Sequence, residues 1–201
     1  MIKNIIFDLG GVILTHKKTL IKDILTSIFP AIKDKAFSFY ITKKKLLRTG
    51  KITSDEFLMS LIKELGSGMD LETLKKIWIR KYKGVAHIDN KILSLVDTVR
   101  KKYKVYLFTD TMEIHDEYNS KRGIYSHFTR VYKSYEEGLI KPDIKAFKNV
   151  LQKIRARTHE CVFIDDLEEN VKAAQSIGMK GIIYRNLGQL ETYLDKIGVE
   201  I

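Results

Sequence analysis

The sequence contains one cysteine and two prolines among its 201 residues. Because Cys161 cannot form an intramolecular disulfide, a reducing compartment is expected. No uncharged apolar run approaches the roughly 20 residues that a membrane-spanning helix needs. The apolar segment near the N-terminus is interrupted by Asp8 and by Gly10–Gly11 and lacks a cleavage pattern, so we expect no signal peptide. These absences predict a cytoplasmic protein that does not associate with membranes.

Hydrophobic residues make up 44% of the sequence, which indicates a folded globular chain. The net charge of +11 is uneven, because residues 16–83 hold 16 Lys/Arg against 7 Asp/Glu. Such a basic segment attracts anionic ligands, although a solvated lysine-rich helix surface explains it equally well. Basic and aromatic residues are not interleaved in a recognisable nucleic-acid-binding motif, so nucleic acid is not an expected partner.

Short apolar runs separated by helical patterns predict an α/β fold with a doubly wound parallel sheet. Four runs read as buried strands, and a fifth is shorter. The strands are expected at residues 3–7, 105–108, 130–132, 161–164 and 181–184. The helices of this part are expected at residues 90–102, 114–121, 144–155, 168–177 and 189–197.

The segment between the first two long strands has helical periodicity and no convincing strand. In "GKITSDEFLMSLIKELG", Thr53 and Glu56 form a capping-box pattern and Gly66 follows the last helical residue. Asp70 is expected to cap the next helix. An all-helical module is therefore expected to be inserted after the first strand. The expected domains are a core of residues 1–15 and 84–201 and a helical module of residues 16–83.

Reactive groups follow three of the predicted strands. They are Asp8 after the strand at 3–7, Thr109 and Asp110 after the strand at 105–108, and Asp165 and Asp166 after the strand at 161–164. Lys141, in "GLIKPD", lies between the last two of these strands. The carboxyl ends of parallel strands lie at one edge of the sheet, where ligands bind in open α/β folds. A single strand-end aspartate is commonly a helix cap or a turn residue. All of these groups in this order indicate a site.

Each group has a plausible role in phosphate chemistry. Asp8 is a carboxylate nucleophile that could form an aspartyl-phosphate. Gly10 and Gly11 let the backbone approach a phosphate and present N–H groups to it. Thr109 offers a hydroxyl and adjacent N–H donors, and Lys141 supplies a positive charge.

The carboxylates also predict a metal ion. Asp8, Asp165 and Asp166 form a cluster of hard oxygen ligands suited to Mg²⁺. Without a cation, these acids and Asp110 would repel one another and a phosphate substrate. A magnesium cofactor is therefore expected.

Four motifs, "FDLGGV", "YLFTDT", "GLIKPD" and "FIDDLEEN", occur in this order. The chain resembles the haloacid dehalogenase-like (HAD) hydrolase superfamily, in the group whose helical cap follows the first strand of a Rossmann-like core. The "DLGG" form and the "GKITSDEF" stretch are most similar to bacterial sugar-phosphate phosphatases of the glucose-1-phosphatase kind.

The resemblance implies a Mg²⁺-dependent HAD-like phosphatase acting on a small phosphorylated metabolite, with the cap closing over the leaving group. It implies two steps, attack by Asp8 on phosphorus and hydrolysis of the acyl-phosphate by water. The metal ligands would be Asp8, the backbone carbonyl of Gly10, and Asp166, with Asp165 binding directly or through water. Asn170 would support the turn after the acidic pair.

The sequence departs from this pattern at Gly10, where most phosphatases of the superfamily carry a second aspartate that protonates the leaving group. Such acid–base catalysis typically contributes ~10²–10⁴-fold, so a substrate with a good leaving group would suffer least. His16 could help, although a surface or packing role is expected. Asp110 is expected to point away and donate only its backbone N–H, or else to point inward, where it adds negative charge or replaces the missing acid. His115 is expected at the solvent-exposed surface, with substrate contact as the alternative.

Other functional classes stay open. The chain could be a catalytically impaired phosphate-binding protein or a metal-free dehalogenase, although a retained nucleophile and an acidic pair argue against these. His87, His127 and His159 show no metal-ligand spacing. Cys161 lies inside an apolar strand and is expected to be an inert core residue.

Overall fold

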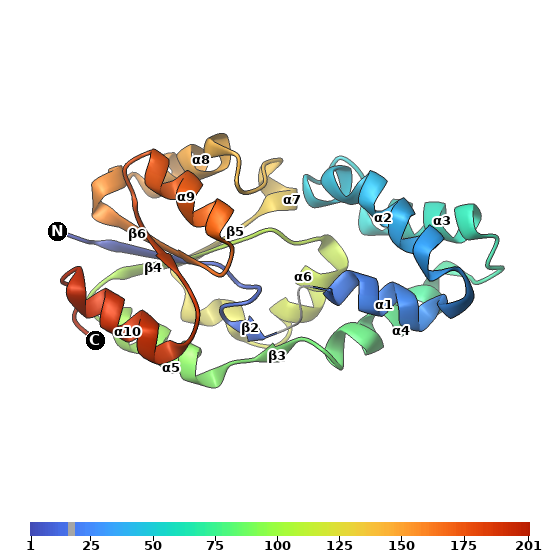
Figure 1. The fold of residues 1–201 in the computed structure, drawn as a ribbon, viewed down its shortest axis with the longest axis horizontal. Coiled ribbons are helices and arrows are strands. Elements are labelled where there is room, and N and C mark those ends of the chain that lie inside the picture. The colour runs from blue at the N-terminus through green and yellow to red at the C-terminus, as the bar shows by residue number, and fades with distance from the viewer. Residues whose placement is uncertain (16–18) are drawn as a thin grey trace.

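The computed structural model describes residues 1–15 and 19–201. Its centre is a five-stranded parallel sheet in the order β5-β4-β1-β6-β7 (Figure 1). The strands are β1 (Asn4–Phe7), β4 (Lys104–Thr109), β5 (Arg130–Lys133), β6 (Cys161–Asp165) and β7 (Lys180–Ile183). The chain starts in the middle strand and crosses in both directions, which confirms the expected doubly wound fold.

Helices cover both faces of the sheet (Figure 1). Alternating strand residues divide between two hydrophobic clusters, so that Ile5 and Phe7 lie in one and Ile6 in the other. The first cluster contains residues of α5 (Asn90–Val99) and α10 (Leu187–Lys196), and the second those of α8 (Ile144–Ile154) and α9 (Glu168–Ser176). Two shorter helices, α6 (Glu113–Ser120) and α7 (Ser134–Glu137), follow strands β4 and β5. Short 3₁₀ turns lie at Pro30–Ile32, Ile124–His127 and Thr158–Glu160.

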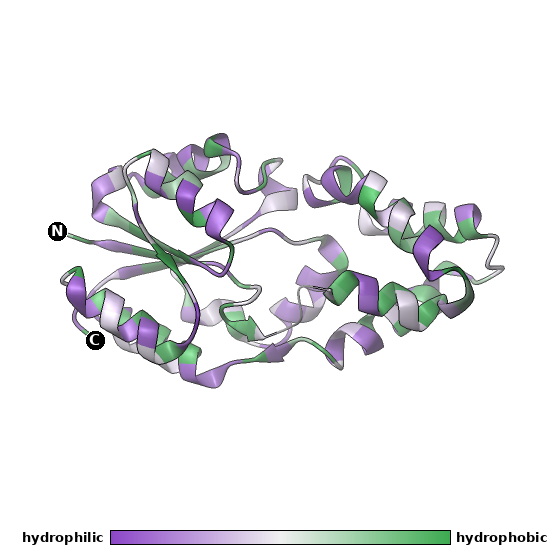
Figure 2. Ribbon diagram, viewed as in Figure 1, coloured by the Kyte–Doolittle hydropathy of each residue, from purple (hydrophilic) through white to green (hydrophobic). Residues whose placement is uncertain are grey.

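Between residues 15 and 87, the described part of the chain forms four α-helices that pack on one another. They are α1 (Leu20–Ile28), α2 (Lys33–Arg48), α3 (Ser54–Leu65) and α4 (Leu71–Lys83). Apolar stripes on these helices face inward (Figure 2), and Phe57 and Trp78 are fully buried among them. We call these four helices the helical module. The expected caps are confirmed, since Thr53 and Glu56 form a capping box, Gly66 adopts a left-handed conformation, and Asp70 accepts from Thr73 N–H.

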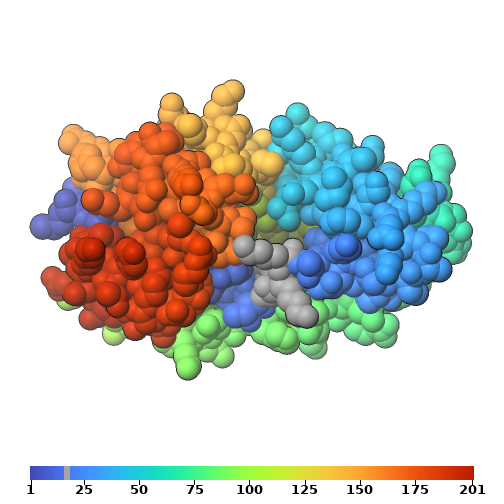
Figure 3. All heavy atoms as spheres, viewed as in Figure 1, coloured from blue at the N-terminus to red at the C-terminus, as the bar shows by residue number. Residues whose placement is uncertain are grey.

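A two-stranded antiparallel ribbon, which the sequence did not predict, joins the module to the sheet region. Its strands are β2 (Leu14–Thr15) and β3 (His87–Ile88), so the two chain segments that enter and leave the module are paired. The module and the sheet region meet along a seam on which α2 lies beside α7 (Figure 3). Among the described residues, no helix is long and apolar enough to cross a membrane.

Candidate active site

Three adjacent strands bring the predicted reactive residues together. Asp8 directly follows β1, and its N–H donates to Ile164 O of β6 at 2.8 Å. Thr109 is the last residue of β4 and Asp165 the last of β6. Because β4, β1 and β6 are parallel neighbours, these residues share one edge of the sheet.

Lys141 is the centre of the charged network at this edge. Its Nζ donates to Asp8 Oδ1 at 2.6 Å, to Asp165 Oδ2 at 2.8 Å and to Phe108 O at 3.0 Å. The Lys141 side chain is only 1% exposed. Burial alone would lower the pKa of Lys141, but the charges of Asp165 and Asp8 outweigh it and hold that pKa well above its ordinary value. The two carboxylates therefore favour the charged form of Lys141.

One lysine does not neutralise the acids around it. Burial raises the pKa of the Asp8 carboxyl to about 7, with Asp165 adding to the rise and Lys141 opposing it. Both Asp8 and Asp165 lie against the same ammonium group. The site therefore favours a further positive charge beside Asp8.

Asp165 is held in place by neutral donors as well. Leu167 N–H donates to its Oδ1 at 2.8 Å, and Asn170 Nδ2 donates to its Oδ2 at 2.9 Å. Asn170 thus makes, with Asp165, the kind of contact expected of a residue that supports the turn after the acidic pair. Its role in activity stays a prediction.

The three predicted carboxylate ligands of the metal lie close together. One carboxylate oxygen from each of Asp8, Asp165 and Asp166 lies within 4.8 Å of the other two. Gly11 makes room for this cluster, because its φ is +78° and a Cβ there would lie 2.5 Å from Asp166 Cγ. Three hard oxygen donors beside a position that accepts no side chain fit a divalent cation such as Mg²⁺.

One of the two glycines, Gly11, differs from the expectation. Gly10 lines the cavity described below, but the Gly11 N–H donates to Leu14 O at 2.8 Å. The expected Gly11 N–H contact with phosphate is therefore wrong, because the tight turn into β2 uses that donor. Gly11 serves the site through its missing side chain.

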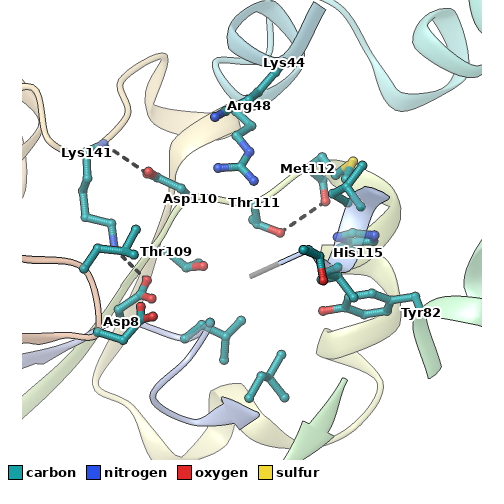
Figure 4. A pocket seen from close by; sticks show the side chains of 18 of the residues that line it. Asp8, Lys44, Arg48, Tyr82, Thr109, Asp110, Thr111, Met112, His115 and Lys141 are labelled. Atoms are coloured by element: carbon teal, nitrogen blue, oxygen red, sulfur yellow. Dashed lines mark hydrogen bonds and ion pairs between the residues drawn. The ribbon is translucent and has the colours of Figure 1, made fainter. Parts of the chain in front are cut away.

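Asp110 was expected to point away from the site, and this expectation is also wrong. It lines the cavity, and its Oδ1 accepts from Lys141 N–H at 3.2 Å (Figure 4). Burial raises the pKa of Asp110, while the Lys141 charge opposes the rise. Asp110 is therefore a third acid, with Asp8 and Asp166, that lines this end of the cavity.

The strand ends open into a cavity of about 400 Å³, which the helical module lines on the opposite side. Thr109 and Lys141 line it together with Asp8 and Asp166. From the module, the lining includes the cations Lys22, Lys44 and Arg48 and the rings of Phe37, Tyr40 and Tyr82. The sequence did not single out these six residues, because helical periodicity does not show which polar side chains face a cavity.

His115 is buried, so the expected solvent exposure is wrong. The residue is 6% exposed and lines the cavity. Its Nε2 accepts from Trp78 Nε1–H at 2.9 Å, and its ring stacks on Tyr82 with centroids 3.9 Å apart. A polar side of α6 packs here against α4, which an apolar pattern cannot reveal. His16, also considered from the sequence, lies outside the described residues.

This geometry can be compared with known proteins. The family model described as haloacid dehalogenase-like hydrolase matches residues 2–178. The chain belongs to this family. The expected family and enzyme class are thereby confirmed, and the catalytic roles of individual residues stay predictions.

Two curated relatives of this HAD-like chain are phosphatases. D-ribitol-5-phosphate phosphatase of Bacteroides thetaiotaomicron is 26% identical over 90% of each chain. A sesquiterpene phosphatase of Aspergillus oryzae is 27% identical over 90% of this chain and 88% of that one. A HAD family enzyme of B. thetaiotaomicron, solved in complex with magnesium and inorganic phosphate, has a TM-score of 0.79 and 27% identity, covering 92% and 95% of the two chains.

Proposed function

We propose that this HAD-like hydrolase is a Mg²⁺-dependent phosphatase that hydrolyses a small phosphate monoester through an aspartyl-phosphate on Asp8. The observation that carries the proposal is the cluster of Asp8, Asp165, Asp166 and Lys141 at the end of a cavity. The relatives named as phosphatases and the neighbour with bound magnesium and phosphate support it. The helical module, with its expected boundaries at residues 16–83, covers the leaving group.

The metal would be held by Asp8, Asp166 and the backbone carbonyl of Gly10, with Asp165 as a direct or water-mediated ligand. When bound, Mg²⁺ supplies positive charge that neutralises the acids and polarises a phosphoryl oxygen. The carboxylate cluster and the open position at Gly11 support this assignment. Thr109 and Lys141 would bind the remaining phosphoryl oxygens.

The reaction would proceed in two displacements at phosphorus. Lys141 holds Oδ1 of Asp8, which leaves Oδ2 as the attacking atom. Asp8 forms a bond to phosphorus while the ester P–O bond breaks, and the electron pair leaves with the alcohol oxygen, which takes a proton from solvent. Water then attacks phosphorus and gives up a proton to solvent while the P–O bond to Asp8 breaks, which releases inorganic phosphate and the Asp8 carboxylate.

Gly10 provides no acid to protonate the leaving alcohol. The enzyme should therefore prefer substrates whose alcohol leaves easily, such as an anomeric sugar phosphate or an acyl phosphate. The relative named for D-ribitol 5-phosphate supports a small phosphorylated metabolite as the substrate class.

The direct test is phosphate release from a panel of sugar, nucleotide and acyl phosphates, with Mg²⁺ or with EDTA. We expect Mg²⁺-dependent turnover that falls by at least about 10³-fold in Asp8→Asn, because the nucleophile is lost. Asp195→Asn is the matched control, since Asp195 is exposed on α10, and it should keep wild-type activity. Equal turnover by Asp8→Asn and Asp195→Asn would contradict the aspartyl-phosphate mechanism.

A second candidate function rests on Gly10. Without an acid at that position, the chain could bind a phosphorylated metabolite and not hydrolyse it. Binding of Mg²⁺ and phosphate by calorimetry, without release of phosphate from any substrate, would support this alternative. A metal-free dehalogenase is disfavoured, because three clustered carboxylates suit a cation better than a halide.

A further inference from the structure

The two ends of the cavity carry opposite charge. The strand ends contribute three carboxylates to the lining and a single lysine. These are Asp8, Asp110, Asp166 and Lys141. Among the described residues, the helical module contributes three cations and no carboxylate to the lining. A ligand that fills the cavity therefore meets a cationic surface at the end away from Asp8.

Two of these cations extend from one helix. Lys44 and Arg48 lie one turn apart on α2, and Figure 4 shows both side chains directed from that helix toward the cavity. Arg48 is half-buried, whereas Lys44 is exposed. Residues four apart share one helix face, so both cations can contact one ligand group.

Neither side chain has an anionic partner within ion-pair distance in the part of the chain that the structure describes. Arg48 acts on Asp110 electrostatically, but the Asp110 carboxylate already accepts from Lys141 N–H. Arg48 therefore has a charge without an ion-pair partner in the described part of the chain, and its planar guanidinium matches carboxylate and phosphate groups.

The space between the two ends suits the body of a small molecule. The rings of Phe37, Tyr40 and Tyr82 line it. Its volume of about 400 Å³ is within the range of small-ligand pockets, roughly 300–1,000 Å³. A compact substrate can thus reach Asp8 with one group and Arg48 with another.

We propose that the alcohol part of the substrate carries a second anionic group, a carboxylate or another phosphate, which Arg48 and Lys44 bind. This inference rests on the phosphatase function proposed above and names its substrate class. A substrate of this class differs from a polyol phosphate such as D-ribitol 5-phosphate, because the alcohol part of a polyol phosphate is neutral and offers these cations no charge.

The test uses two matched pairs of substrates with Mg²⁺. 3-Phosphoglycerate and glycerol 3-phosphate differ by a carboxylate in place of a hydroxymethyl group. Fructose 1,6-bisphosphate and fructose 6-phosphate differ by a second phosphate. Wild-type kcat/KM should be at least about tenfold higher for the anionic member of one pair, the gain expected from a charge-assisted hydrogen bond. The pair that shows this preference identifies the second anion.

Arg48→Met should lower kcat/KM for the preferred substrate about 10- to 100-fold and leave its neutral counterpart within about threefold. Lys44→Met should act in the same direction with a smaller effect, and its exposed position keeps the test valid if Arg48→Met unfolds. Lys45→Met is the control, since Lys45 is exposed on the same helix outside the cavity lining. Lys45→Met removes the same charge and should leave kcat/KM unchanged for both substrates.

Three results would overturn the inference. The first is that wild-type enzyme shows no preference within either pair. The second is that Arg48→Met lowers kcat/KM equally for both members of a pair, which would place Arg48 on the transferred phosphoryl group. Lys45→Met could match Lys44→Met, which would indicate general attraction of anions. If wild type releases phosphate from neither pair nor from p-nitrophenyl phosphate, the proposed phosphatase function itself fails.

Discussion

Lys141 and Arg48 are cations that line the same cavity, one from the sheet region and one from the helical module, and their surroundings differ. Lys141 is 1% exposed and contacts two carboxylates and a carbonyl. Arg48 is half-buried and forms no ion pair among the residues that the structure describes. The first is part of the folded structure, whereas the second lacks a partner that a ligand can provide. Removing each charge should therefore have different consequences for stability.

The largest expected effect is on stability at the strand ends. Lys141→Met leaves Asp8 and Asp165 buried without their cation, so it should lower the free energy of unfolding by about 3–5 kcal/mol in EDTA. Lys44→Met removes the same charge from an exposed position and should change the free energy of unfolding by no more than about 0.5 kcal/mol. Urea unfolding at pH 8 measures both values. Equal changes in the free energy of unfolding for the two variants would show that the ion pairs of Lys141 do not stabilise the fold.

The second comparison concerns space beside the acids. Gly11 and Gly198 both have positive φ, at +78° and +79°, but only the Cβ of an alanine at position 11 would meet other atoms. Gly198→Ala should cost about 1 kcal/mol for the backbone conformation alone. Gly11→Ala should cost about 2–3 kcal/mol and weaken Mg²⁺ binding, because Asp166 must move. Urea unfolding and Mg²⁺ titration by calorimetry measure these effects, and unchanged Mg²⁺ affinity would argue against Asp166 as a ligand.

The strand-end part of the site could be predicted from sequence because the sheet imposes its position. A buried parallel strand has one carboxyl end, so Asp8, Thr109 and Asp165 had to share an edge once their strands were recognised. The capping box of Thr53 and Glu56 was equally readable, because it depends on local spacing.

Other features depend on contacts that leave no local pattern. Strands β2 and β3 have two residues each, too few to show an alternation. The Gly11 N–H donates to Leu14 O within a turn. The buried His115 accepts a hydrogen bond from Trp78, which lies 37 positions away in the sequence. Which lysine or arginine of α2 lines the cavity depends on how the module docks. The positions of the strand-end residues were therefore predictable, and the module residues that line the cavity were not.

The smallest expected effect is that of a new acid at position 10, and it tests which residues supply the proton that the leaving group needs. If the helical module supplies none, Gly10→Asp should place a carboxyl acid at the strand ends and raise kcat for a poor leaving group at least about tenfold, about 1.4 kcal/mol. p-Nitrophenyl phosphate, whose leaving group needs no proton, should gain little. Gly10→Asn is the control, because it adds a side chain of similar size without an acid. If Gly10→Asp and Gly10→Asn behave alike while wild type hydrolyses both kinds of ester well, another group, such as Asp110 or a residue of the helical module, already protonates the leaving alcohol.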